Sequence, residues 1–509
     1  METKTAAIEM RNITKRFGPV LANDKVWLNI YRGEILALLG ENGSGKTTLM
    51  NMLSGIYFPD EGEIKIDGKE VVIRSPKDAF DNGIGMIHQH FKLVDVLTAA
   101  ENIVLGLPGK LDLKAASAKI REICDKYGFS VDPAQKIYDM SVSQKQTVEI
   151  VKVLYRGADI LILDEPTAVL TPQETDKLFA VLRNMRNDGK AIVIITHKMH
   201  EVEALSDRVA ILRHGQFIGD MLTAHTNAQE MTNMMVGHAV SLNIERPDPV
   251  DPKPRIEVKG LTVRSVDGIV KLDDVSFTAN SGEIVGIAGI SGCGQKELLE
   301  AIAGLQTVES GSISYIEDDG SREELIGKDP LSIAELGVSL SFVPEDRLGM
   351  GLVGNMNLAD NMMLRSFRRG KSIFTDRRSP RALAESVVQE LSVSTPSVDT
   401  PVRRLSGGNV QKVLVGREIA SAPTVLLTAY AVRGLDIHSS YTIYDLINRQ
   451  KKAGVAVIFV GEDLDVLLEL CDRILVLCGG KVSGIVSGRG AEKREVGMMM
   501  TKLGGQSHE

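Results

Sequence analysis

Short apolar segments alternate with longer amphipathic segments along the whole chain. Strand-length apolar runs include "ILALLG", "DILIL", "AIVIIT" and "VAVIFV", whereas "PQETDKLFAVLRNMRNDGK", Pro172 to Lys190, spaces its apolar residues as a helix does. Strands that are connected by helical crossovers predict an α/β fold with a mostly parallel sheet. Residues 91–138 read as more helical, so we expect a helical subdomain set into this α/β core.

The same order of segments occurs twice. "RGEILALLGENGSGKTTLM" in the first half matches "SGEIVGIAGISGCGQKELL" in the second, and the two loops begin at Gly40 and Gly289, 249 positions apart. Between the copies, "ERPDPVDPKPR", Glu245 to Arg255, holds four prolines in eleven residues, which is incompatible with a helix or a central strand. We therefore predict one domain at 1–245, a proline-rich linker at 246–254 and a second domain at 255–509.

Composition narrows the class of protein. A chain of 509 residues exceeds what a single core usually supports, which agrees with two domains. The formal net charge of −8 gives no broad cationic field, so no nucleic-acid partner is expected. The four cysteines lack C-x-x-C spacing, which argues against a zinc site or a disulfide framework. The apolar runs fall far short of the ~20 residues that a membrane helix needs.

A phosphate-binding loop follows the first of these apolar runs. "GENGSGKT" fits the pattern G-x-x-x-x-G-K-[ST] between a strand and a helix, the context that this motif requires, and a chance glycine-rich turn is the weaker reading. Backbone N–H groups of such a loop close around phosphate oxygens, the lysine supplies a cation, and the final hydroxyl can bind Mg²⁺. The predicted ATP-binding residues here are Gly40, Glu41, Asn42, Gly43, Ser44, Gly45, Lys46, Thr47 and Thr48, with Thr47 also a ligand of Mg²⁺.

Two acids end a later strand, in "DILILDE". Asp164 can hold Mg²⁺ through water, and Glu165 can take a proton from the water that attacks the γ-phosphate. A solvated strand end is the plainer reading of two neighbouring acids, but the phosphate loop upstream favours catalysis.

"LSGGN", Leu405 to Asn409, opens the helix-like stretch "VQKVLVGREIA", and its small residues leave a helix N-terminus that can meet a phosphate. With this motif the chain resembles the ATP-binding cassette family over nearly all of both halves. The resemblance implies two tandem P-loop NTPase domains with ATPase activity. It also implies that Gln89 in "GMIHQHF" senses Mg²⁺ and the partner subunit, that His197 in "IITHKMHEV" contacts the γ-phosphate, and that Phe17 stacks on adenine. Without the family, His197 would be interpreted as a core residue, and for Phe17 core packing is the weaker alternative.

The second copy has lost nearly every catalytic residue. We therefore expect no hydrolysis there, although Gly289, Gly292 and Gly294 leave weak nucleotide binding open. The replacements for Lys46, Thr47, Gln89, Asp164, Glu165 and His197 are Gln295, Lys296, Glu345, Ala429, Tyr430 and Glu462.

Cassettes of this family work as head-to-tail pairs, so the resemblance implies that each ATP needs the signature of the opposite copy. Ser406, Gly407, Gly408 and Asp436 of the second copy would then complete the ATP site of the first. The corresponding signature of the first copy, "MSVSQ", has lost both glycines. All intact parts thus fall into one composite site, formed within one chain or between two chains.

The chain is a tandem fusion with one degenerate half, and its second half contains "PEDR" after a strand and "RGLD" after the turn that has lost its acids. In these three features it resembles bacterial importers of sugars and nucleosides. "YRGADILILDEPTAVLTPQE" and "THKMHEV" look closest to the nucleoside branch. The resemblance implies an ATPase docked on two membrane permease subunits at the cytoplasmic face of the membrane, as a peripheral protein. A lipoprotein or periplasmic receptor would deliver the ligand, whose identity the ATPase sequence leaves open.

Two other classes compete with an importer. A soluble tandem cassette that remodels ribosomes or nucleic acid would use a basic surface, and one basic cluster occurs at Arg365 to Arg381. A solvated or subunit-facing surface is the favoured reading of this cluster. A P-loop kinase would have no reason to contain "LSGGN".

Overall fold

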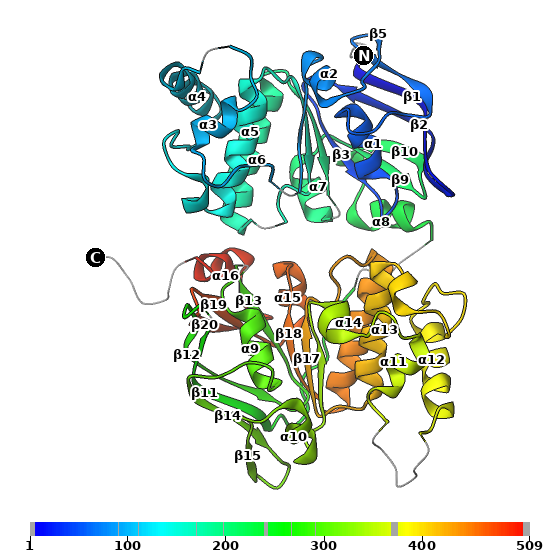
Figure 1. Ribbon diagram of the computed structural model, residues 1–509, viewed down its shortest axis with the longest axis vertical. Coiled ribbons are helices and arrows are strands. Elements are labelled where there is room, and N and C mark those ends of the chain that lie inside the picture. Colours follow the sequence, from blue (N-terminus) through cyan, green and yellow to red (C-terminus); the bar gives the residue numbers. More distant parts are fainter. Residues whose placement is uncertain are drawn as a thin grey trace. The chain divides into compact units, whose positions relative to one another are not determined.

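The computed structural model describes residues 6–89, 91–109, 111–168, 170–196, 198–238, 243–265, 267–290, 292–367 and 375–501. The chain divides into two compact units, 1–241 and 242–509, each with its own sheets and helices (Figure 1). This division falls four residues before the predicted end of the first domain, and the residues predicted as a linker group with the second unit. Within the described residues, no helix has the length and apolar character needed to cross a bilayer.

The first unit is built on a six-stranded sheet in the order β10-β9-β3-β8-β7-β6. Only β10 runs antiparallel to its neighbour, so the prediction of a mostly parallel α/β sheet is confirmed. All residues of β3, β7 and β8 are buried, as expected for strands covered on both faces. The strands are β3 (Ile35–Leu39), β6 (Ile84–Ile87), β7 (Ile160–Asp164), β8 (Ala191–Ile195), β9 (Arg208–Arg213) and β10 (Gln216–Leu222).

A second, antiparallel sheet in the order β2-β1-β4-β5 completes the β-structure of this unit, and the sequence patterns did not predict it. Its strands are β1 (Ala6–Phe17), β2 (Val20–Tyr31), β4 (Glu61–Ile66) and β5 (Lys69–Val71). The second half of β2 buries alternate residues, as expected where one face packs on the core and the other meets solvent.

The predicted helical subdomain is present. Helices α3, α4 and α5 gather on one side of the unit, away from β1 and β2 (Figure 1), and share a small apolar core of their own. The helices of the first unit are α1 (Lys46–Leu53), α2 (Pro76–Asp81), α3 (Ala99–Val104), α4 (Leu113–Tyr127), α5 (Val142–Tyr155), α6 (Pro172–Asn187), α7 (Met199–Leu205) and α8 (Ala228–Val236).

The second unit repeats this plan. Its six-stranded sheet has the order β16-β17-β18-β13-β19-β20 and its four-stranded sheet the order β12-β11-β14-β15, which match the first unit strand for strand. The strands are β11 (Pro254–Arg264), β12 (Val270–Asn280), β13 (Ile284–Gly289), β14 (Ser310–Ile316), β15 (Arg322–Glu324), β16 (Leu340–Val343), β17 (Val425–Ala429), β18 (Ala456–Val460), β19 (Arg473–Cys478) and β20 (Lys481–Ser487). The helices are α9 (Gln295–Ile302), α10 (Pro330–Glu335), α11 (Leu358–Met363), α12 (Arg378–Glu390), α13 (Gly407–Ala420), α14 (Ile437–Lys452), α15 (Leu464–Leu470) and α16 (Lys493–Met499).

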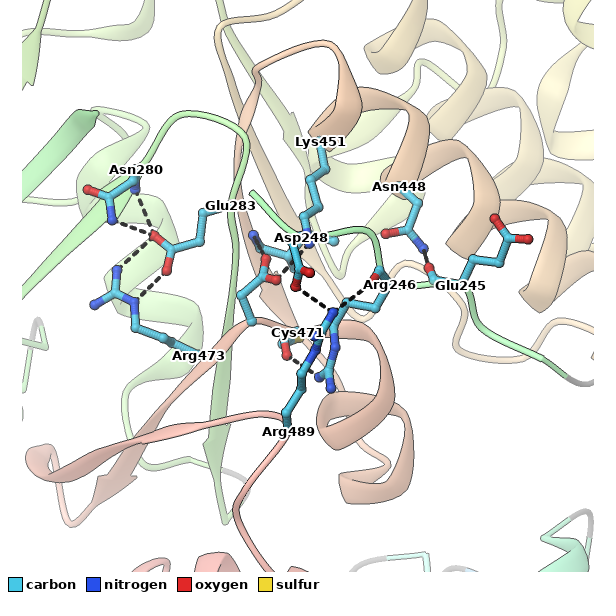
Figure 2. A network of polar contacts seen from close by, with 12 residues as sticks. Glu245, Arg246, Asp248, Asn280, Glu283, Asn448, Lys451, Cys471, Arg473 and Arg489 are labelled. Atoms are coloured by element: carbon cyan, nitrogen blue, oxygen red, sulfur yellow. Dashed lines mark hydrogen bonds and ion pairs between the residues drawn. The ribbon is translucent and has the colours of Figure 1, made fainter. Parts of the chain in front are cut away.

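The start of the proline-rich segment is fastened to the second unit (Figure 2). Arg246 Nη1 donates hydrogen bonds to the carbonyl oxygens of Leu468 and Cys471, at 2.6 Å each, where α15 ends. The last carbonyls of a helix lack partners within the helix, so the guanidinium caps α15. Arg489 pairs with Asp248 and donates a 3.1 Å hydrogen bond to the carbonyl oxygen of Arg246. The chain is thus already part of the second unit several residues before β11 begins.

Candidate nucleotide-binding site

The phosphate loop of the first unit connects β3 to α1 and requires glycine at two positions for lack of space. A Cβ atom on Gly40 would lie 2.3 Å from the carbonyl oxygen of Leu212, and one on Gly45 would lie 2.3 Å from that of Ala22. Gly45 also has a φ of +95°, in the left-handed region that glycine adopts at low cost. The hydroxyl of Ser44 is buried and has no hydrogen-bond partner in the described part of the chain, so it keeps a bond to offer a ligand. These features fit a phosphate cradle.

Lys46 lies inside this loop, with 8% of its surface exposed. Its Nζ atom donates hydrogen bonds to the carbonyl oxygens of Gly40, at 2.7 Å, and Glu41, at 2.9 Å. Burial lowers the pKa of the Lys46 ammonium, and the nearby carboxylates of Glu165 and Asp164 act in the opposite direction. The loop therefore holds its cation between its own carbonyls and the two strand-end acids.

Oxygen donors for a divalent cation meet at the end of β7. Thr47 Oγ1 donates a 3.2 Å hydrogen bond to Asp164 Oδ2, although the two residues are 117 positions apart. Burial raises the pKa of the Asp164 carboxyl, and the hydrogen bond from Thr47 partly counters this rise. A hydroxyl and a carboxylate side by side form the oxygen-only ligand set that Mg²⁺ prefers, so these residues fit the predicted metal.

Glu165 stands one residue beyond β7 in a strained backbone turn. Its φ is +47°, which is uncommon for a residue with a side chain and frequent at functional sites. Gln89 Nε2, at the end of β6, donates a 3.0 Å hydrogen bond to Glu165 Oε2. Tyr430 has a φ of +54° at the equivalent position of the second unit, so the turn is kept where the acid is lost.

His197, predicted to contact the γ-phosphate, lies outside the described residues. Its neighbours are held by a buried carboxylate: Thr196 Oγ1 donates a 3.2 Å hydrogen bond to Glu201, and Lys198 Nζ lies 3.2 Å from the same side chain. The segment on each side of His197 is therefore anchored to the start of α7.

Phe17 is 41% exposed, so the interpretation of this residue as core packing is wrong. The ring of Tyr57 meets it edge to face, with centroids 5.1 Å apart and planes at 71°. The ammonium of Lys15 lies 5.6 Å from the centroid of the Phe17 ring. An exposed aromatic surface beside a cation suits an aromatic, anionic ligand such as a nucleotide.

The two signature segments differ in how their helices begin. In the first unit, Ser141 and Gln144 form a reciprocal capping box at the start of α5, so these two N–H groups already have partners. In the second unit, Ser406 caps α13 by accepting bonds from Asn409, and Gly407 and Gly408 form the first turn without side chains. The first turn of α13 therefore has no side chains at the two positions where α5 carries those of Val142 and Ser143.

Asp436, a predicted ATP-binding residue, caps α14 in the structure. Its carboxylate accepts hydrogen bonds from the backbone N–H of Ser439, at 2.7 Å, and from the Ser439 hydroxyl, at 2.6 Å. Thr171 occupies the same capping position in the first unit, before α6. The helix cap explains a short polar residue at both places, and an ATP contact of Asp436 stays a prediction.

The degenerate centre of the second unit is filled by its own side chains. Gln295 takes the place of Lys46 and donates a 3.1 Å hydrogen bond to the carbonyl oxygen of Ile290. Arg433 bridges two carboxylates, with Nη1 2.6 Å from Glu345 Oε1 and Nε 3.0 Å from Glu462 Oε1. Burial, with these acids nearby, raises the pKa of the Tyr430 phenol to about 12. Internal ion pairs have thus replaced the catalytic groups.

The structure brings Lys46, Thr47, Gln89, Asp164 and Glu165 together at the carboxyl ends of parallel strands, where open α/β sheets bind their ligands. Sequence reasoning missed two contributors. One is buried Asn23, whose Nδ2 donates a 3.3 Å hydrogen bond to the carbonyl oxygen of Gly45; the sequence carried no signal for it. The other is Arg433. The sequence did contain a signal for it, because Glu345 and Glu462 replace catalytic residues of the first unit, and two neighbouring carboxylates are stabilised by a cation between them.

We expect Asp164→Asn to stabilise the protein in the absence of nucleotide and Mg²⁺. The pKa of Asp164 is higher in the folded protein than in the unfolded chain. The free energy of unfolding therefore falls as the pH rises from the unfolded pKa through the folded one. The amide can still accept the bond from Thr47. The midpoint of thermal unfolding in EDTA at pH 7.5 should rise, by about 2–4 °C for each kcal/mol gained in a domain of this size.

The advantage of Asp164→Asn should shrink as the assay pH is lowered toward the acidic range, while stabilisation by Mg²⁺ with ATP should be lost. A lower unfolding midpoint than that of the wild type at pH 7.5 would show that the carboxylate stabilises the fold.

Comparison with known proteins agrees with the geometry. The model of the ABC transporter family matches residues 23–168 and 272–428. The chain is 42% identical to the nucleoside import ATP-binding protein NupA of Lactococcus lactis subsp. cremoris, over 99% of both chains. It is 41% identical to the guanosine import ATP-binding protein NupO of Bacillus subtilis, over 97% of both chains. It is 39% identical to the glucose import ATP-binding protein TsgD13 of Haloferax volcanii, over 98% of this chain and 96% of that one.

These similarities confirm the resemblance inferred from the motifs. Both matched segments begin before the phosphate loop of their unit. The first ends just beyond β7, which leads into the two acids, and the second ends within β17, the equivalent strand. The similarity to the three relatives extends over both units. Because the family model matches both units and the three relatives are import ATP-binding proteins that align over nearly their full length, this chain belongs to the ABC transporter family.

Proposed function

We propose that this chain is the ATP-hydrolysing subunit of an importer that takes up a nucleoside, with a simple sugar as the alternative cargo. The observation that carries the proposal is similarity over nearly the whole chain to ATP-binding proteins named for nucleoside and guanosine import. A relative named for glucose import is almost as similar, which is why sugar remains the alternative. ATP binding and hydrolysis would drive the two-state motion of the membrane subunits.

Hydrolysis takes place in the first unit. Lys46 binds the outer phosphates of ATP, and the glycine loop surrounds them with N–H groups. Water attacks the γ-phosphorus, the bond from that phosphorus to the β–γ bridging oxygen breaks, and Glu165 takes the proton of the water. Gln89 supports this geometry, because its amide holds Glu165 Oε2 at 3.0 Å.

Thr47, Gln89 and Asp164 would hold Mg²⁺, which when bound neutralises part of the phosphate charge. His197 contacts the γ-phosphate, and Phe17 stacks on adenine. Ser406, Gly407, Gly408 and Asp436 of a second unit, from the same chain or another, complete the site. The start of α13, where Gly407 and Gly408 carry no side chains, offers backbone N–H groups to the charge that develops in the transition state.

The chain docks on two membrane permease subunits as a peripheral protein at the cytoplasmic face of the membrane, and an extracytoplasmic receptor delivers the cargo. Exposed apolar residues on and beside the helical subdomain of the first unit support docking. Val96 is 67% exposed, Leu111 66% and Tyr138 61%. Large apolar side chains with this exposure are available for contact with a partner protein.

A remodelling factor for ribosomes or nucleic acid is not favoured. Two of the four arginines that the structure describes in the basic cluster from Arg365 to Arg381 are paired: Arg365 pairs with Glu418, and Arg381 makes two 2.8 Å hydrogen bonds to Asp399. Residues 368–374 of the cluster lie outside the described residues. Paired arginines have less positive charge to offer to phosphates.

Reconstitution with permease subunits and a receptor of a nucleoside importer from the same organism tests the function. In proteoliposomes, we expect the receptor loaded with guanosine, adenosine or uridine to raise ATP hydrolysis and to deliver radiolabelled nucleoside into the lumen. Ribose and glucose serve as matched competing cargoes. Stimulation by a sugar but not by nucleosides would move the assignment to the sugar branch, and co-purification with ribosomes instead of permeases would refute an importer.

A further inference from the structure

Arg347 of "PEDR" joins the two segments of the second unit that are proposed to serve the ATP of the first. Its Nη1 atom donates a 3.0 Å hydrogen bond to the carbonyl oxygen of Gly407, in the signature, and its Nη2 atom donates to the carbonyl oxygen of Arg433, in "RGLD". A Cβ atom on Gly407 would lie 3.2 Å from Nη1, and one on Gly434 would lie 3.7 Å from Nη2. The guanidinium therefore fills the space between these two turns.

An arginine suits this place for a physical reason. The planar guanidinium presents its N–H groups in a fixed fork, so one side chain can hold two backbone carbonyls at a fixed separation. Partial burial, with the neighbouring charge of Arg433, lowers the pKa of Arg347, but an arginine stays charged at any working pH. A lysine could reach the same carbonyls only as a single point charge.

The degenerate centre extends this connection. Arg433, whose carbonyl oxygen Arg347 binds, uses its side chain to bridge Glu345 and Glu462. Its guanidinium lies 5.9 Å from the centroid of the Tyr430 ring. These three partners stand where the first unit has Gln89, His197 and Glu165. The side chains that replaced the catalytic groups thus hold "RGLD", and through Arg347 they hold the signature.

The first unit lacks both arginines. Phe91 stands where the second unit has Arg347, two residues beyond the loop glutamine, and Ala168 stands where it has Arg433. The first unit is also the one whose signature has lost its glycines. The two arginines therefore occur together with the intact signature and not with the degenerate one.

We propose that Arg347 is a positioning residue for ATP hydrolysis in the first unit. By fixing Gly407 and the "RGLD" turn at one spacing, it sets where the start of α13 meets the γ-phosphate. This inference rests on the proposed function, in which the signature of the second unit completes the site of the first. A misplacement of about 1 Å in a preorganised site can cost on the order of 10² in rate.

The test compares Arg347→Ala and Arg347→Lys with the wild type as full-length proteins. We expect Arg347→Ala to lower kcat by on the order of 10² while the Kd for ATP stays within about threefold, because ATP is held by the loop of the first unit. The kcat of Arg347→Lys should lie between those of Arg347→Ala and the wild type, because lysine keeps the positive charge but lacks the forked guanidinium. Arg381→Ala is the matched control, because Arg381 is half-exposed and pairs only with the carboxylates of Asp399 and Glu385 in the contacts described.

A kcat of Arg347→Ala within threefold of the wild type would overturn the proposal. So would an equal loss of ATP affinity and kcat, since Arg347 would then support the fold or the ATP pocket. If Arg347→Ala does not fold, Arg347→Lys decides by the same two measurements. Glu165→Gln, assayed in parallel, separates the two claims: if it stays active, the proposed function fails, and if it is inactive while Arg347→Ala is active, only the positioning role fails.

Discussion

Replacement of Glu165 by glutamine should abolish ATP turnover while ATP still binds. The amide keeps the size of the side chain and can keep a hydrogen bond to Gln89, which lies 3.0 Å away, but it cannot take a proton from water. We expect kcat to fall by on the order of 10²–10³, the usual cost of removing one preorganised catalytic group. Phosphate release in the steady state and equilibrium binding of a fluorescent ATP analogue would measure the two effects separately.

Tyr430→Phe is the matched control for this variant. Tyr430 holds the equivalent turn of the second unit with a φ of +54°, and its pKa of about 12 keeps the phenol protonated at neutral pH. It therefore has no proton-accepting role to lose, and its replacement should leave kcat within threefold of the wild type. Comparable losses in both variants would refute the assignment of hydrolysis to the first unit alone.

Lys46→Ala should weaken ATP binding and nearly eliminate hydrolysis. The ammonium is the cation that the loop contributes to the outer phosphates, and a charge-assisted hydrogen bond of this kind is worth about 1.5–3 kcal/mol, or about 10- to 160-fold in affinity. A further loss in kcat on the order of 10²–10³ follows if the same group stabilises the transition state. Equilibrium dialysis with ATP and steady-state hydrolysis at saturating ATP would give both numbers.

Gln295→Ala provides the comparison in the second unit. Gln295 lies in the same position as Lys46 and donates to the carbonyl oxygen of Ile290, but it carries no charge. We expect its loss to change ATP affinity and kcat by less than threefold. The reverse result, in which Gln295→Ala loses ATP affinity and kcat while Lys46→Ala keeps both, would place the hydrolysed ATP in the second unit.

The larger part of the fold could be predicted because the core strands are fully apolar. Every residue of β3, β7, β8 and β18 is buried, so these strands appear in the sequence as unbroken apolar runs separated by amphipathic helices. The antiparallel sheet of β1, β2, β4 and β5 was missed because its strands are half-exposed and because β1 pairs with β4, which follows only after β3 and helix α1 in the sequence. Local alternation shows that a strand is present but not which strand it pairs with.

The parts of the candidate site in which a sequence motif fixes the backbone could be predicted. The contacts that depend on side-chain conformations could not. The loop from Gly40 to Thr47 and the two acids at the end of β7 could be placed at one edge of the sheet, because parallel strands end there together. The hydrogen bond from Gln89 to Glu165 was not predicted, since it depends on the rotamers of two long side chains 76 positions apart. The same holds for Arg433, whose two partners lie on different loops.

The cap that Arg246 places on α15 decides where the second unit can be separated as an independent fragment. A cut within the prolines, at 247–254, would leave two carbonyls at the end of α15 without their cation. It would also remove Arg246 from beside Gly488, where a Cβ atom would lie only 2.6 Å from Nη1. A fragment that begins at residue 243 keeps this cap, so the natural point of separation lies ahead of the proline-rich stretch.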